Sequence, residues 1–268
     1  MQNTTLSLAQ LDAQALGDPL IYAMASRDAD VTRLVRDALS QGRGQLAFHP
    51  VVTAETGNLV AFHEGLIRLS DEEGRIIPAA HFMPQIEESY LGREIDCLSL
   101  RLALQELGKN PSLRLSVNLS ARSIGDGAWR RTLQRGLIEN STLGDRLIFE
   151  ISETSAMMLH ENVTRFMAEM QPKGVGFALD GFGAGLIALR HLRSFLFDLV
   201  KIDKSFVRGI DKDTDNQMLV EALISVAHQF EMFVVADGIE TAAEAAFLQG
   251  LGVDCMQGYH FGVPTFEI

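Results

Sequence analysis

Short apolar runs rich in β-branched and aromatic residues alternate with longer segments of helical spacing along this chain. The β-type runs cover residues 45–53, 59–69, 113–120, 146–153, 174–180, 199–203, 232–240 and 255–262. The helical patterns cover residues 28–42, 91–108, 128–139, 161–171, 185–194, 215–230 and 241–250. Apolar strands with little polar alternation suit a parallel sheet that is buried on both faces. About eight such units in about 250 residues predict an α/β fold, a (β/α)8 TIM-like barrel.

An open doubly wound sheet is the alternative, but no Gly-x-Gly-x-x-Gly follows the first predicted strand. The alternation has no compositional break, so we expect one barrel domain over residues 29–268. The weakly patterned residues 1–28 are predicted to be an N-terminal extension or a linker from a larger parent protein. Asp30 is the predicted N-cap of the first helix, and Gly42 follows its last turn.

The acidic composition limits the classes of partner. The 268 residues include 23 Lys and Arg against 35 Asp and Glu, a net charge of −12. Such a surface argues against binding DNA or anionic lipid, but not against a small phosphorylated ligand held through a metal ion. The N-terminus lacks a basic n-region, no apolar run is long enough to span a bilayer, and Cys97 and Cys255 have no metal-binding spacing. We therefore expect a cytoplasmic protein without membrane insertion.

Polar residues recur near the carboxyl ends of the predicted strands. They are Glu64, Asn118, Glu150, Asp180, Lys201, Asp237 and Gln257. In an eight-stranded barrel these ends converge on one face, where such enzymes react. The first four carry oxygen donors and predict a site for Mg²⁺, Mn²⁺ or Ca²⁺. Lys201 could anchor a phosphate or the attacking water, and Asp237 could be a base or a ligand to a second metal.

Each of these residues alone has a simpler explanation. A single acid after a strand is more often a helix N-cap, and Asn118 or Gln257 alone is more often a turn or loop residue. Lys201 alone is more often a solvated strand end. The repeated coincidence of strand end and polar type favours a site. Spacing alone does not separate a phosphodiesterase from an enolase-like enzyme that uses acids, a metal and a lysine.

Six short motifs follow one another between Gln45 and Pro264. They are Glu64 to Arg68 (Glu-x-Leu-x-Arg), the "IPAAHFMPQIEE" segment (77–88), Asn118 to Ser120 (Asn-Leu-Ser), the pair Glu150 and Glu153 (Glu-x-x-Glu), Lys201 to Asp203 (Lys-Ile-Asp) and Gln257 to Tyr259 (Gln-Gly-Tyr). In type, order and spacing they resemble the EAL-domain family of cyclic di-GMP phosphodiesterases.

The resemblance implies a barrel that holds cyclic di-GMP across its carboxyl face. In active members two Mg²⁺ or Mn²⁺ ions activate a water that opens the ring to linear pGpG, and Ca²⁺ is an expected inhibitory substitute. The implied metal ligands are Glu64, Asn118, Glu150 and Asp180. The implied catalytic residues are Lys201, Asp237 and Glu153, of which Glu153 would brace the loop after Asp180. The implied substrate-binding residues are Leu66, Arg68, His49, Gln257 and Glu240.

Four departures from the family pattern bear on catalysis. The paired aspartates become Asp180-Gly181, the first glutamate of Glu-Gly-Val-Glu becomes Asp237, and the glutamine of Tyr-Gln-Pro becomes His49. The Thr-Gly-Tyr-Ser-Ser loop becomes "AGLIAL" (184–189). Without a carboxylate at Gly181, the second ion is held less well. The shorter arm of Asp237 moves its carboxylate by about an ångström, and a misplacement of that size can cost ~100-fold in rate.

We therefore expect a cyclic di-GMP receptor with one well-held ion and weak or absent hydrolysis. An active phosphodiesterase that tolerates these changes is the alternative. A nucleotide-independent interaction module is the second alternative, favoured by the apolar residues Leu186 and Ile187. The resemblance also implies a homodimer through residues 181–195, and a downstream protein partner is the other expected contact.

Overall fold

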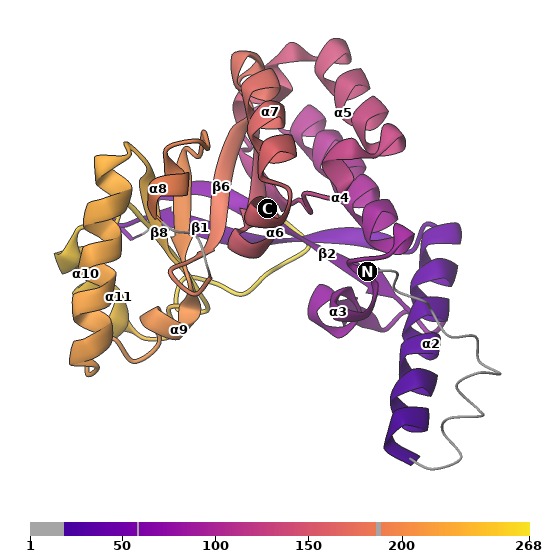
Figure 1. Cartoon of the computed structure of the whole chain (residues 1–268), viewed down its shortest axis with the longest axis horizontal. Helices are drawn as coiled ribbons and strands as arrows, with labels where there is room; N and C mark the ends of the chain where they lie inside the picture. The colour runs from indigo at the N-terminus through magenta and orange to yellow at the C-terminus, as the bar shows by residue number, and fades with distance from the viewer. Residues whose placement is uncertain (1–18, 58, 186–188) are drawn as a thin grey trace.

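Eight strands close into a barrel in the computed structural model, which describes residues 19–57, 59–185 and 189–268 (Figure 1). In spatial order they are β1 (Gly44–Thr53), β2 (Val60–Ser70), β4 (Leu115–Asn118), β5 (Leu147–Ser152), β6 (Gly176–Phe182), β7 (Leu199–Ile202), β8 (Phe233–Ala236) and β9 (Cys255–Gln257). β1 pairs with both β2 and β9, which closes the ring, and β3 (Ile76–Pro78) extends β2 on its outer side. The predicted TIM-like barrel is confirmed.

The first strand departs from a regular parallel barrel. β1 runs antiparallel to both of its neighbours, whereas the pairs from β2 round to β9 are parallel. The cause lies in residues 54–59, because a link this short can join a hairpin but cannot hold the helix that a parallel crossover needs. The hairpin register sets His49 directly opposite Glu64.

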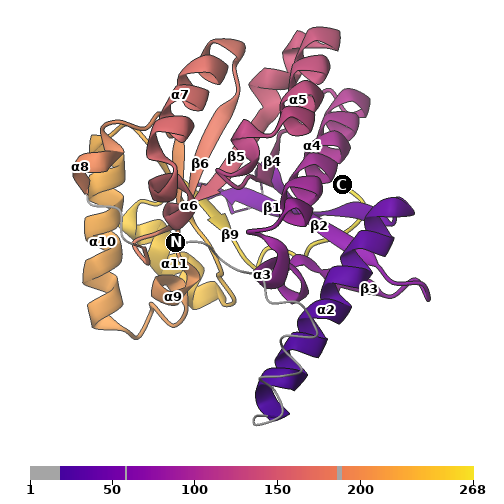
Figure 2. The same cartoon turned by 45° about the vertical axis from the view of Figure 1, so that its right-hand side comes forward.

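Helices cover the outside of the barrel (Figure 2). The long ones are α4 (Tyr90–Lys109), α5 (Gly127–Glu139), α7 (His160–Met170), α10 (Thr214–Gln229) and α11 (Ala242–Leu251). The short ones are α3 (Met83–Ile86), α6 (Glu153–Met158), α8 (Leu189–Leu192) and α9 (Lys204–Val207), with 3₁₀ turns at Ala79–His81, Ser123–Gly125, Ser141–Arg146 and Gln171–Lys173. The five long helices agree with the predicted patterns. Of the pattern at 185–194, α8 is the described helical part, and Leu186 and Ile187 lie outside the described residues.

Helix α2 (Pro19–Ser40) begins earlier than predicted. Asp30 lies inside it, so the predicted N-cap is wrong, and its carboxylate pairs with Arg33 at 2.7 Å. The predicted end is confirmed: Gly42 has a φ of 65° and donates its N–H to the carbonyl of Leu39 at 3.2 Å. Figure 1 shows the first turns of α2 extending away from the barrel. The predicted boundary between residues 28 and 29 falls inside this helix, and the division into extension and barrel stays a prediction.

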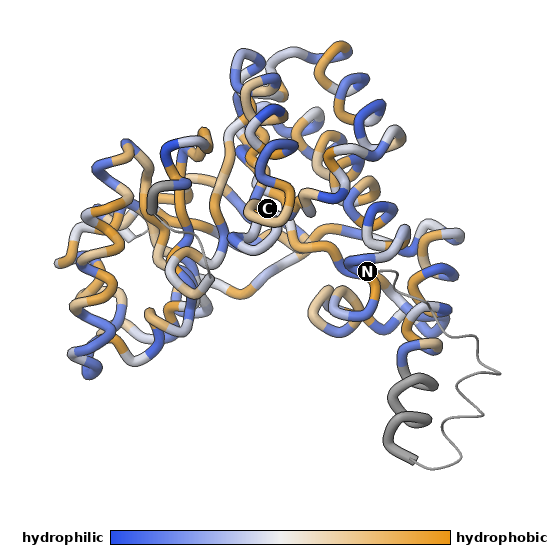
Figure 3. The backbone as a smooth tube through the Cα atoms, viewed as in Figure 1, coloured by the Kyte–Doolittle hydropathy of each residue, from blue (hydrophilic) through white to orange (hydrophobic). Residues whose placement is uncertain are grey.

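Apolar side chains form the core between the strands and the outer helices, and the outer helices carry polar residues on their other faces (Figure 3). Within this core the rings of Phe149 and Phe166 each contact the rings of Trp129 and Phe177, and Trp129 and Phe149 are centred 5.4 Å apart. Tilted and edge-on ring pairs of this kind add to the free energy of burial. Within the described ranges the helices are too short or too polar to cross a membrane.

Candidate functional site

The polar residues of the site lie directly above the apolar layer that fills the barrel. That layer consists of Val51, Phe62, Ala178, Leu199 and Val235. Two positions further along four of the same strands lie Glu64, Asp180, Lys201 and Asp237. Since side chains two apart on a strand share a face, the apolar layer and the polar layer both point into the barrel. The apolar layer therefore closes the site toward the interior of the barrel and excludes water from that side.

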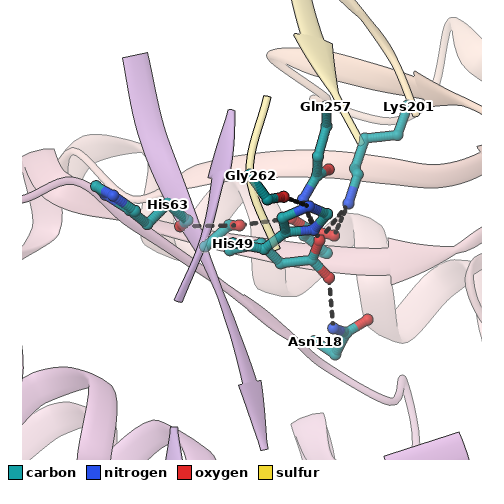
Figure 4. A network of polar contacts seen from close by, with 9 residues as sticks. His49, His63, Asn118, Lys201, Gln257 and Gly262 are labelled. Atoms are coloured by element: carbon teal, nitrogen blue, oxygen red, sulfur yellow. Dashed lines mark hydrogen bonds and ion pairs between the residues drawn. The ribbon is translucent and has the colours of Figure 1, made fainter. Parts of the chain in front are cut away.

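Lys201 is the centre of the polar layer (Figure 4). Its side chain is 2% exposed, and its Nζ lies 2.9 Å from Oε2 of Glu64 and 2.9 Å from Oε2 of Glu150. Asn118 donates to Oε1 of Glu64 at 3.2 Å. Gln257, which is fully buried, donates to Oε2 of Glu64 at 2.8 Å. The barrel thus brings together five of the residues that the sequence predicts for the site.

Burial and mutual repulsion shift the pKa values of the acids around Lys201. Burial raises the pKa of Glu150 to about 8, and the neighbouring Glu64 carboxylate adds to the rise. Burial also raises the pKa of Asp180 and of Asp237, against the opposing effect of Lys201. Burial disfavours the charge of Lys201, but Glu150 and Glu64 outweigh it and keep its pKa well above the ordinary value. One buried ammonium thus serves several acids, and an added cation would lower their pKa values by stabilising the charged forms.

A β-bulge aims Asp180 into this cluster. The pairing of β6 with β7 advances from Leu179–Val200 to Phe182–Ile202, so β6 carries one extra residue between them. Gly181 supplies it, with a φ of 75° that glycine adopts without strain. A Cβ added at Gly181 would meet no atom of the described residues within 4 Å. Among these residues, the position next to Asp180 is therefore open space.

His49 contacts Gln257 and Gly262 through its two ring nitrogens. Gln257 Nε2 lies 3.0 Å from Nδ1 of His49, and His49 Nε2 lies 3.1 Å from the carbonyl oxygen of Gly262. Burial lowers the pKa of His49, so the ring is neutral at pH 7. Both ring nitrogens therefore have partners within the chain. The predicted substrate contact through His49 stays a prediction.

A cavity of about 410 Å³ adjoins the cluster on the side of α3 and α4. Leu66, Asn118 and Glu150 line it, together with two apolar residues, Ala79 in the turn before α3 and Met83 at the start of α3. Its volume and mixed lining are those of a small-molecule site. Three of the predicted site residues therefore line one cavity, namely Leu66, Asn118 and Glu150.

Three further predicted residues, Arg68, Glu240 and Glu153, lie outside the Lys201 cluster. Arg68 is half-buried on β2, where its guanidinium interacts electrostatically with Glu64 and Tyr259. The carboxylate of Glu240 is half exposed and pairs with Arg208 at 2.7 Å.

Glu153 begins α6 and lies directly against the loop that follows Asp180. A Cβ added at Gly185 would fall 2.0 Å from Oε2 of Glu153, so only glycine permits this approach. Such a contact is what the predicted bracing role needs, and the role itself stays a prediction.

Two residues of the site region were missed by the sequence reasoning. Ser116 donates to Oε1 of Glu150 at 2.5 Å and is fully buried. The sequence could have predicted this contact, because Ser116 lies two residues before Asn118 on the same strand and the two side chains therefore share a face. Asp96 on α4 accepts hydrogen bonds from the N–H of Ser120 at 3.1 Å and the hydroxyl of Ser123 at 2.6 Å. Burial raises the pKa of Asp96 to about 7.

The donor set fits a hard cation by chemistry but is not arranged as a coordination shell. Glu64, Asn118, Glu150 and Asp180 supply carboxylate and amide oxygens, the ligands of Mg²⁺ and Ca²⁺. In the described ranges, however, no three His, Cys, Asp or Glu side chains lie close enough together to hold a metal ion. The ammonium of Lys201 lies between the two glutamates instead.

A family comparison covers most of the chain. The sequence model of the EAL domain matches residues 32–264. The cyclic di-GMP phosphodiesterase PdeR of Escherichia coli K12 is 31% identical over 236 residues, which cover 86% of this chain and 35% of PdeR. The bifunctional diguanylate cyclase/cyclic di-GMP phosphodiesterase MucR of Pseudomonas aeruginosa is 27% identical over 249 residues, which cover 90% of this chain and 36% of MucR. The chain spans about a third of the length of the curated relatives it matches.

Two solved structures are similar over nearly their whole length. The FimX EAL domain from Pseudomonas aeruginosa, bound to c-di-GMP, superposes with a TM-score of 0.81 at 25% identity and covers 88% of this chain and 97% of its own. The PaMucR phosphodiesterase in complex with c-di-GMP superposes with a TM-score of 0.77 at 26% identity and the same coverage.

Proposed function

Because the chain belongs to the EAL domain family, we propose that it binds cyclic di-GMP at the carboxyl ends of its barrel strands and acts as a receptor with weak or absent phosphodiesterase activity. Relatives of the same fold bind this nucleotide, which supports the choice of ligand. The cavity beside Asn118 and Glu150 has the volume of a small-molecule site. Arg68, on the same strand as Glu64, would offer its guanidinium to a phosphate.

The observation that carries the proposed loss of activity is Gly181. It follows Asp180 at the bulge, and no side chain of the described residues fills the space beside it. In a two-metal phosphodiesterase the second ion stabilises one of the two oxygens of the in-line displacement. A carboxylate missing at this position would leave that ion poorly held. Asp237, immediately after β8, reaches less far than the glutamate that the family pattern has there, which supports the same conclusion.

We propose that Mg²⁺ or Mn²⁺ binds to Glu64, Asn118, Glu150 and Asp180, with Ca²⁺ as a substitute that does not support hydrolysis. The ion would supply charge neutralisation at the phosphate. Lys201 would remain a buried cation beside it and hold the phosphate or a water in place. The pKa values of Glu150, Asp180 and Asp237 are raised, and a bound cation would lower them by stabilising the charged forms, which supports this assignment.

The second candidate function is an active phosphodiesterase. It would add a water oxygen to one phosphorus and release the 3′ oxygen of the neighbouring ribose, which takes the proton, so that linear pGpG forms. The intact contacts of Lys201 with Glu64 and Glu150 favour this candidate, as does the name of PdeR. Gly181 weighs against it.

Calorimetric titration with cyclic di-GMP in the presence of Ca²⁺ tests the proposal. We expect saturable binding to the wild type and a loss of at least about tenfold in affinity for Arg68→Met, because a charged hydrogen bond to phosphate is removed. Arg193→Met, outside the cavity lining, is the control and should bind as the wild type does. Absence of heat at tens of micromolar protein would contradict the receptor function. Chromatography of the same samples with Mn²⁺ reports any pGpG.

A further inference from the structure

The orientation of the Gln257 side-chain amide is fixed from two sides. Its Nε2 donates one hydrogen to Oε2 of Glu64 at 2.8 Å and the other to Nδ1 of His49 at 3.0 Å. If the amide were turned over, its oxygen would face two acceptors. The observed orientation leaves the carbonyl oxygen of Gln257 buried and without a hydrogen bond to any described residue. Figure 4 shows this oxygen on the side of the amide turned away from His49.

The ring of His49 can accept from Gln257 only in one tautomer. Its Nε2 lies 3.1 Å from the carbonyl oxygen of Gly262, which accepts but cannot donate. Nε2 must therefore carry the proton, and Nδ1 presents its lone pair to Gln257. The antiparallel hairpin makes this possible, because it places His49 opposite Glu64, while β9 pairs Gln257 with Val51, two positions from His49 on β1.

We propose that His49 is a positioning residue: held by Gly262 as the Nε2–H tautomer, it fixes the amide of Gln257 so that the Gln257 carbonyl oxygen accepts a hydrogen bond from a donor group of the bound cyclic dinucleotide. A buried acceptor without a partner costs free energy, which a ligand donor would recover on binding. His49 then acts through Gln257 and not by touching the ligand. The inference rests on the proposed function for the identity of the ligand.

The tautomer is tested without any ligand. In long-range ¹H–¹⁵N spectra of histidine-labelled protein at neutral pH, we expect His49 as a neutral ring protonated at Nε2. His49→Phe identifies its signals by their loss. A His49 protonated at Nδ1, or a doubly protonated ring, overturns the inference.

Binding tests the action through Gln257. We expect His49→Phe to weaken cyclic di-GMP binding by about three- to tenfold, the effect of one hydrogen bond. His49→Gln, which can accept and donate at the same place, should bind within about twofold of the wild type. In a Gln257→Met background, His49→Phe should cause no further loss, because the group it positions is gone. His63→Phe is the matched control, since His63 neighbours Glu64 on β2 with its side chain on the other face.

The outcomes separate this inference from the proposed function. Equal binding by His49→Phe and the wild type, with both folded by thermal melting, overturns the positioning role. The same holds if the losses in His49→Phe and Gln257→Met simply add. If the wild type does not bind cyclic di-GMP, the receptor function fails. The tautomer of His49, and the two amide proton signals of Gln257 with and without His49→Phe, then still decide whether the histidine fixes the amide.

Discussion

The ammonium of Lys201 lies 2.9 Å from Oε2 of Glu150, and both side chains are almost completely buried. Glu64, on β2, contacts the same ammonium at 2.9 Å. This contact makes the lysine the counter-ion of the acid cluster as well as a candidate for phosphate binding. A substitution of Lys201 should therefore affect both the stability of the fold and the binding of a phosphate.

Lys201→Met should lower the free energy of unfolding by about 3–5 kcal/mol, because it leaves buried carboxylates without their partner. Urea unfolding measures this. Lys109→Met is the control, since Lys109 pairs with Glu106 on the surface of α4 at 2.7 Å and should contribute less than about 1 kcal/mol. Equal effects of the two substitutions would contradict the role of Lys201 as buried counter-ion.

Divalent cations should partly replace the lysine. With Lys201 removed, we expect Mg²⁺ or Ca²⁺ to raise the Tm of Lys201→Met by more than that of the wild type, because an ion that binds only the folded state stabilises it. Differential scanning calorimetry with and without each ion measures the shift. If neither protein responds to millimolar cation, the proposed hard-cation site is wrong.

Asp96 should make stability depend on pH. Its pKa is about 7 when folded against an ordinary 3.8, so the folded state binds the proton more tightly and stability falls as pH rises between these values. Asp96→Asn cannot ionise and should escape this loss. We expect the stability of the wild type to fall by about 2 kcal/mol relative to Asp96→Asn between about pH 5.5 and about pH 8. Urea unfolding at both pH values gives the difference, in which the other titrating groups cancel.

Glu139→Gln, on the exposed end of α5, is the control for that comparison. Its stability relative to the wild type should be the same at both pH values. A pH-independent difference between the wild type and Asp96→Asn would show that Asp96 is ionised throughout.

Gly185→Ala should disturb the loop after Asp180. Its Cβ would overlap the carboxylate of Glu153, so we expect a loss of about 1–3 kcal/mol and weaker cyclic di-GMP binding. In a Glu153→Ala background the overlap is gone, and the cost of Gly185→Ala should shrink accordingly. The Cβ of Gly250→Ala in α11 would meet no described atom within 4 Å, so this substitution should instead stabilise by about 0.5–1 kcal/mol. Additive effects of the Gly185 and Glu153 substitutions would contradict the contact.

Local pattern predicted most elements well. The pattern at 241–250 became α11 (Ala242–Leu251), with Thr241 and Glu244 as a capping box that the structure reveals. The early start of α2 was missed because Asp30 looks like a cap, although the helix passes through it. The antiparallel β1 was also missed, although the short link at residues 54–59 argues for a hairpin.

The site was predicted as a set of residues but not as a geometry. Strand ends identify Glu64, Glu150 and Lys201, since parallel strands bring such ends together. The position of Lys201 between the two glutamates depends on the rotamers of all three side chains, whose strands are far apart in sequence. The bulge at Gly181 depends on the register between β6 and β7, which no local pattern encodes.

Cyclic di-GMP binding and pGpG formation, measured on the same samples of wild type, Gly181→Asp and Gly181→Asn, test the central claim most directly. The space beside Gly181 admits either side chain, and Asp and Asn tolerate its left-handed φ better than most residues, at about 1 kcal/mol. We expect the wild type to bind with little or no turnover, Gly181→Asp to gain hydrolysis by at least about tenfold with Mn²⁺, and Gly181→Asn not to gain it. Wild-type turnover at several per minute, unchanged by Gly181→Asp, would contradict the account.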